Sequence, residues 1–152
     1  MRLSLALLPV LVIAVPLGAA LSAHEHAAPV AVTVYKNAQC GCCRNWVEHL
    51  RKEGFQVTAK DVDDLAAIKA KLGVPASLTS CHTAVVGPYL VEGHVPAADI
   101  RKLLADKPKI AGIGVAGMPM GSPGMEMKGM PAEKYDVMTF AKDGKQRVFA
   151  AH

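Results

Sequence analysis

The sequence has few aromatic residues, few cysteines and no block of like charges. Aromatic residues make up 5% of the 152 residues, so the core must be built mainly from Val, Leu, Ile and Ala. The lysines between positions 102 and 109 have no aromatic residues among them. This pattern is typical of a solvated surface rather than a nucleic-acid interface. Internal repeats are absent, and the length fits one domain.

The one long apolar run lies at the N-terminus and has the layout of a secretory signal peptide. Arg2 precedes an uncharged stretch that Pro9 and Pro16 interrupt, and small residues follow it. We predict that residues 1–23 are removed by a cut after Ala23, although a cut after Ala20 also fits. A retained membrane anchor is the alternative. Removal predicts a periplasmic protein without membrane attachment.

Residues 24–29 form a short polar lead that we expect to be flexible. A cut after Ala23 would begin the mature chain with His-Glu-His, from His24 to His26. An α-amine and a histidine at the third position can chelate Cu(II) through backbone nitrogens. A disordered polar tail is the plainer interpretation.

Residues 30–152 are predicted to form a single α/β domain. Strands are expected at 30–36, 55–62, 82–87 and 89–93, and helices at 43–54, 63–73 and 95–106. This order predicts a small mixed sheet flanked by helices. Residues 111–134 are rich in Gly, Pro and Met and are predicted to be a long loop. Residues 135–152 predict a terminal β-hairpin that turns at Asp143-Gly144.

Three of the four cysteines lie in the stretch "AQCGCCR", at positions 40, 42 and 43. Cys40 and Cys43 have the C-x-x-C spacing, and they follow a predicted strand and enter a predicted helix. That context is typical of a thioredoxin-like redox site. Unpaired N–H groups at a helix N-terminus also stabilise a thiolate, which is both a nucleophile and a metal ligand. Position alone therefore does not separate redox chemistry from metal binding.

Cys42 favours metal binding over redox chemistry. A disulfide enzyme needs two thiols, and a third between them invites scrambling. Three soft donors within one turn suit Cu(I), or zinc as the less favoured ion, and several sulfurs can bridge more than one ion.

Cys81 is the fourth cysteine. It stands where thioredoxin-like domains carry a cis-proline facing the C-x-x-C motif, so we expect it to complete a four-thiolate site. The alternative is a small buried hydrophobic residue.

Three stretches resemble a known family: "TVYKNAQCGCCRNWVEHL", "SCHTAVVGPYLVEGHVPAADI" and "GMPMGSPGME". They are similar to the CopG-like periplasmic proteins linked to copper resistance, and the resemblance runs from Val30 to His152. It implies a thioredoxin-like fold, export, and copper bound by the cysteines, which carries over to Cys40, Cys42, Cys43 and Cys81. It does not indicate whether the task is relay, storage or Cu(I)/Cu(II) redox.

Histidines and methionines supply further candidate ligands. His82 is expected to be a ligand or to support one, and His49 to lie on the surface. His94 is expected to be a residue of a helix cap, with metal ligation as the less favoured alternative. Thioethers prefer Cu(I). Five methionines crowd the predicted loop, at Met118, Met120, Met125, Met127 and Met130. They either contact copper, with Met118, Met120 and Met125 as candidate ligands, or pack on the domain.

These observations support three hypotheses. The first is a periplasmic protein that holds Cu(I) on cysteine thiolates and meets other copper-handling proteins. The second is an enzyme, a thiol–disulfide oxidoreductase that uses Cys40 and Cys43. The third is a structural zinc domain, which is less favoured because the strands and helices can bury a core without metal.

Overall fold

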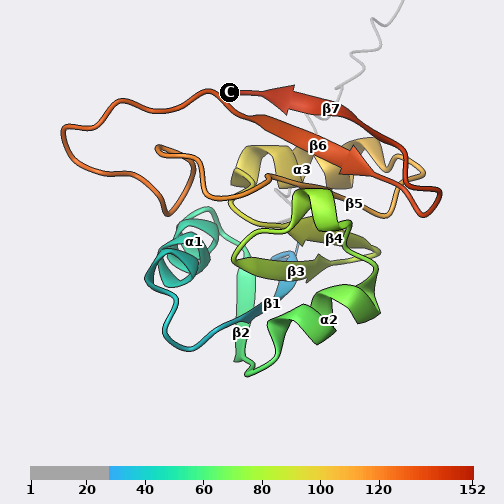
Figure 1. Ribbon diagram of the computed structural model, residues 1–152, viewed down its shortest axis with the longest axis horizontal. Coiled ribbons are helices and arrows are strands. Elements are labelled where there is room, and N and C mark those ends of the chain that lie inside the picture. Colours follow the sequence, from blue (N-terminus) through green and yellow to red (C-terminus); the bar gives the residue numbers. More distant parts are fainter. Residues whose placement is uncertain (1–27) are drawn as a thin grey trace, which may run out of the picture.

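The computed structural model describes residues 28–152, and the predicted signal peptide, His24 and His26 lie outside them. One seven-stranded sheet has the strand order β2-β1-β3-β4-β5-β6-β7 (Figure 1). The pairs β1/β2 and β4/β5 are parallel and the others are antiparallel. The strands are β1 (Ala31–Lys36), β2 (Gln56–Asp61), β3 (His82–Val86), β4 (Tyr89–Glu92), β5 (Gly112–Gly114), β6 (Asp136–Phe140) and β7 (Gln146–Ala151).

Three α-helices flank this sheet, and the mixed α/β fold that the sequence predicts is confirmed. They are α1 (Gly41–Lys52), α2 (Leu65–Leu72) and α3 (Ala97–Asp106), and a short 3₁₀ turn covers Ala76–Leu78. The predicted helices and strands are present with their ends shifted by no more than two residues. In the described residues, no helix is long and apolar enough to cross a membrane.

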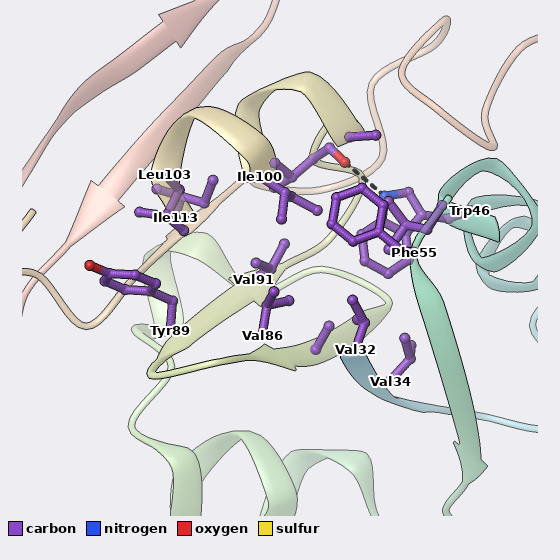
Figure 2. Close-up of a cluster of buried hydrophobic side chains, with 14 of the residues drawn as sticks. Val32, Val34, Trp46, Phe55, Val86, Tyr89, Val91, Ile100, Leu103 and Ile113 are labelled. Atoms are coloured by element: carbon purple, nitrogen blue, oxygen red, sulfur yellow. Dashed lines mark hydrogen bonds between the residues drawn. The ribbon is translucent and has the colours of Figure 1, made fainter. Parts of the chain in front are cut away.

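The core lies between one face of the sheet and helices α1 and α3. Figure 2 shows Val32, Val86 and Val91 pointing from their strands toward Ile100 and Leu103 of α3. Trp46 of α1 is fully buried, and its Nε1–H donates to the Val95 carbonyl oxygen at 2.9 Å (Figure 2). This hydrogen bond satisfies the one polar atom of the side chain and ties α1 to the segment before α3.

Helix α2 covers the opposite face of the sheet. Side chains alternate between the two faces along a strand, so Thr83 of β3 points away from its buried neighbour Ala84. Lys69 of α2 donates to Thr83 Oγ1 at 2.9 Å, which places α2 on the Thr83 face. Figure 1 shows α2 and α3 on either side of the central strands.

One element of the predicted loop 111–134 is a strand. Residues Gly112–Gly114 form β5, which joins β4 to the terminal hairpin. The sequence hides this strand because glycine has a low strand propensity. At Gly112 only glycine fits, since a Cβ there would collide with the Leu90 carbonyl oxygen of the neighbouring strand. The rest of the stretch is irregular, as predicted.

Candidate metal site

The first three cysteines surround the N-terminus of α1. Cys40 is the N-cap residue, and its Sγ accepts the Cys43 N–H at 3.2 Å. The helix therefore begins at Gly41 rather than at the predicted position 43. Its first turn holds no acidic residue. The free N–H groups and the positive end of the helix dipole thus face the sulfurs, which favours thiolate over thiol.

All four cysteines lie together. Their sulfurs are within 4.8 Å of one another. Cys40 and Cys43 form a disulfide, while Cys42 and Cys81 are free thiols. Cys42 Sγ lies 3.4 Å from Cys40 Sγ and 3.6 Å from Cys81 Sγ. The fold therefore brings Cys81 to the cluster from a distant part of the sequence, in the oxidised state of the C-x-x-C pair.

His94, expected to be a residue of a helix cap, contacts Cys81 instead. It is fully buried, and its Nε2 lies 2.9 Å from Cys81 Sγ. Its Nδ1 lies 2.8 Å from the Pro123 carbonyl oxygen, which can only accept a hydrogen bond. Nδ1 therefore carries the proton, and the lone pair of Nε2 faces the sulfur. Histidines that bind metals are commonly held in this way by a backbone carbonyl.

The sequence contains a signal that places His94 near Cys81. A two-residue turn at Gly87-Pro88 pairs each residue of one strand with the residue equally far from the turn on the other. The observed register follows this rule, with Thr83 opposite Glu92. Continued past the strand ends, the same register sets His94 opposite Cys81.

His82 is the first residue of β3 and is buried on the core side of the sheet. Its ring lies 4.3 Å from the Trp46 ring and 4.9 Å from the His94 ring, centroid to centroid. Nδ1 lies 3.6 Å from Cys81 Sγ. Nε2 is buried and has no hydrogen-bond partner among the described residues. Cys81, His82 and His94 form a second group of candidate ligands that shares Cys81 with the cysteine group.

The ionisation of these groups follows from burial. Burial raises the pKa of the Cys81 thiol to about 12, and the charge of Cys42 adds to the shift. Burial also lowers the pKa of His94 and holds the pKa of His82 well below its ordinary value. Near neutral pH Cys81 is therefore a thiol that donates a hydrogen bond to the neutral imidazole of His94. A soft metal ion would replace that proton.

The loop after β5 closes over the end of α1. Gly124 has a φ of +87°, and a Cβ there would lie 2.8 Å from both Cys42 O and Trp46 N. Pro123, beside it, is the residue whose carbonyl holds His94. Of the predicted methionine ligands, Met120 and Met125 are half-buried, and Met118 is 52% exposed. The other two loop methionines, Met127 and Met130, are also exposed.

Comparison with known proteins identifies the family of this chain. A family model described as "Protein of unknown function, DUF411" matches residues 78–125, which include Cys81, His82 and His94. Two solved structures of copper resistance protein CopG, called Form 1 and Form 2, are 47% and 46% identical to this chain. Each match covers 82% of this chain and 98% of the other, with a TM-score of 0.77. The chain belongs to the CopG family. No curated protein matches it.

Membership of the CopG family, which the sequence motifs predict, is thus confirmed by similarity over nearly the whole length of those relatives. The donors in this chain fit the ions that such a name implies. Once the disulfide is reduced, four sulfurs and the Nε2 lone pair of His94 form a soft donor set. Among the described residues, His82 Nε2 is buried without a hydrogen-bond partner.

Proposed function

We propose that this protein is a periplasmic copper-handling protein whose cargo is Cu(I). One observation carries the proposal: four cysteine sulfurs lie within 4.8 Å of one another at a helix N-terminus, with His94 Nε2 2.9 Å from one of them. Cys40, Cys42, Cys43 and Cys81 would bind as thiolates, and several could bridge more than one ion. The relatives called copper resistance proteins support this cargo.

Loading requires reduction of the Cys40–Cys43 disulfide. A dithiol reductant, which is itself oxidised to a disulfide, supplies the two electrons and two protons that convert the Cys40–Cys43 disulfide to two thiols. Each thiol then loses its proton to form a sulfur–copper bond. In the oxidised state, Cys42 and Cys81 are the only cysteines that remain as donors, beside the two imidazoles. The redox state of the C-x-x-C pair would therefore set how much Cu(I) the site holds.

Other groups would support the thiolates. His82 would approach through Nδ1, and the thioethers of Met118, Met120 and Met125 would capture copper at the loop surface. Other periplasmic copper-handling proteins would deliver or remove the ion at the exposed end of α1. We also propose that β1 to β4 with α1 form a thioredoxin-like core, and that the N-terminal run directs export.

Titration of the reduced protein with Cu(I) against a competing chelator tests the proposal. We expect ultraviolet sulfur–copper charge-transfer bands and tight binding. Because loss of groups that merely support a ligand already lowers metal affinity 10–100-fold, Cys81→Ser and Cys42→Ser should each lower affinity by about 100-fold or more. Lys142→Ala, in the turn between β6 and β7, is the control. Weak binding that depends on neither cysteine would refute the proposal.

The Cys40–Cys43 disulfide favours a second candidate, a thiol–disulfide oxidoreductase. A disulfide at a helix N-terminus has the position of a catalytic redox pair. Reduction of a protein disulfide that requires only Cys40 and Cys43, and that survives Cys42→Ser, would favour the enzyme. Absence of turnover in a protein that binds Cu(I) tightly would favour the copper protein.

A further inference from the structure

The buried residue of helix α2 is a lysine rather than one of its apolar residues. Lys69 is 7% exposed and is the buried residue of this helix. The apolar residues Leu65, Ile68 and Leu72, which are spaced three and four apart, are only half-buried. A charged side chain is rarely found inside a protein unless it is paired. The buried face of α2 is therefore organised around an ionic contact.

The partner of Lys69 is Glu92, at the end of β4, which is fully buried. Glu92 Oε1 accepts hydrogen bonds from Lys69 Nζ and, at 2.7 Å, from the Ser80 backbone N–H. Glu92 Oε2 accepts from Thr83 Oγ1 at 2.5 Å. Both carboxylate oxygens are thus engaged, which an amide with one oxygen could not reproduce in the same way.

The two carboxylate oxygens of Glu92 bind both ends of the segment 80–83. Ser80 precedes Cys81, and Thr83 follows His82. Cys81 itself lies in a bend before β3 begins at His82, so no strand pairing fixes its backbone. Ser80 is further held because its Oγ donates to the Gly117 carbonyl oxygen. A Cβ on Gly93 would lie 2.6 Å from Ser80 Cβ, so the two segments are in close contact.

We propose that Glu92, assisted by Lys69 and Thr83, is a positioning group that fixes the Cys81 sulfur between the cysteine cluster and His94. The inference rests on the proposed function, because it concerns the site that would hold Cu(I). Glu92 acts on Cys81 through the Ser80 N–H on one side and the Thr83 hydroxyl on the other. Lys69 balances the charge that this double contact requires inside the protein.

Two double variants separate the hydrogen bonds from the charges. Lys69→Leu with Glu92→Leu removes both charges and both contacts to the segment. Lys69→Leu with Glu92→Gln also removes both charges, but the amide oxygen can still accept the Ser80 N–H while the amide NH₂ donates to Thr83. The two proteins differ only in whether residue 92 can hold the segment. Thermal unfolding of each shows how much stability it has lost.

The first measurement needs no metal. In a chain carrying Cys40→Ser, Cys42→Ser and Cys43→Ser, the alkylation rate of Cys81 by iodoacetamide reports how often the segment opens. We expect this alkylation to be several-fold faster in K69L/E92L than in K69L/E92Q, because only the second variant can still hold the segment. With all four cysteines present, Cu(I) affinity should be about 10–100-fold lower in K69L/E92L than in K69L/E92Q.

Equal alkylation rates and equal Cu(I) affinities in the two double variants would overturn the proposal, whatever their stabilities. If K69L/E92L does not fold, Thr83→Val removes one contact without changing the shape of the side chain. It should speed alkylation of Cys81 to a smaller extent, and an unchanged rate would then overturn the proposal. Failure of the wild-type protein to bind Cu(I) would refute the proposed function, but it would leave the alkylation result intact.

Discussion

The two ends of the β3–β4 hairpin differ in both shape and chemistry. At the turn, Gly87-Pro88, lies a hollow of about 780 Å³ lined by Lys71, Leu90, Ile110 and Lys142 among others, with no cysteine, histidine or carboxylate. At the open end, Cys81 contacts His94, and Glu92 accepts a hydrogen bond from the neighbouring Ser80 N–H. The hollow at the turn therefore lacks the sulfur and imidazole donors that lie at the open end. In this fold, function is indicated by convergent donor atoms rather than by space.

Loss of the His94 imidazole should have a large effect at the open end. His94→Asn removes the nitrogen that faces Cys81, and we expect Cu(I) affinity to fall about 10–100-fold. His49→Asn is a matched control, because His49 Nε2 accepts the Ala97 N–H and lies outside both groups of candidate ligands. Competition with a Cu(I) chelator measures both. Equal affinities for the two variants would remove His94 from the site.

A second contrast lies within the loop that covers the open end. Gly124→Ala places a methyl group against Cys42 O and Trp46 N, whereas Gly129→Ala has a similar φ of +83° but open space. Both variants carry the cost of a positive φ. The collision should cost Gly124→Ala about 1–3 kcal/mol more in the free energy of unfolding. Urea denaturation checks this, and equal losses would mean that the loop does not pack on α1.

A third effect is the pH dependence of the metal-free protein. Burial keeps the pKa values of His82 and His94 below their ordinary value, so the unfolded chain binds more protons as pH falls through about 6.5. Stability should therefore decrease from pH 7 to pH 5, by up to about 1.4 kcal/mol per pH unit for each histidine. His82→Asn should flatten this slope. An unchanged slope would indicate that His82 has the same pKa in the folded and unfolded chain.

The fold could largely be predicted because its signals are local. Runs such as "HTAVV" and the 3–4 spacing of Trp46, Val47 and Leu50 identify strands and a helix by themselves. Strand β5 could not be predicted, because two of its three residues are glycines and its position depends on Leu90 and Phe140 in neighbouring strands.

The residues of the site also divide into those that local signals predict and those that depend on distant contacts. The cysteine motif and Cys81 could be chosen from residue type and spacing, and the identity of the turn would have added His94. The contact between Lys69 and Glu92 could not be foreseen, because it joins α2 to β4 across 23 positions, and Lys69 interrupts rather than follows an apolar pattern. Buried polar contacts between elements leave no periodic signal in a sequence.

X-ray absorption at the copper edge of the reduced, Cu(I)-loaded protein tests the central claim most directly. The account predicts a first shell dominated by sulfur with a smaller nitrogen contribution, and a loss of sulfur scattering after Cys81→Ser. A first shell of nitrogen and oxygen alone, or a spectrum that Cys81→Ser leaves unchanged, would contradict it.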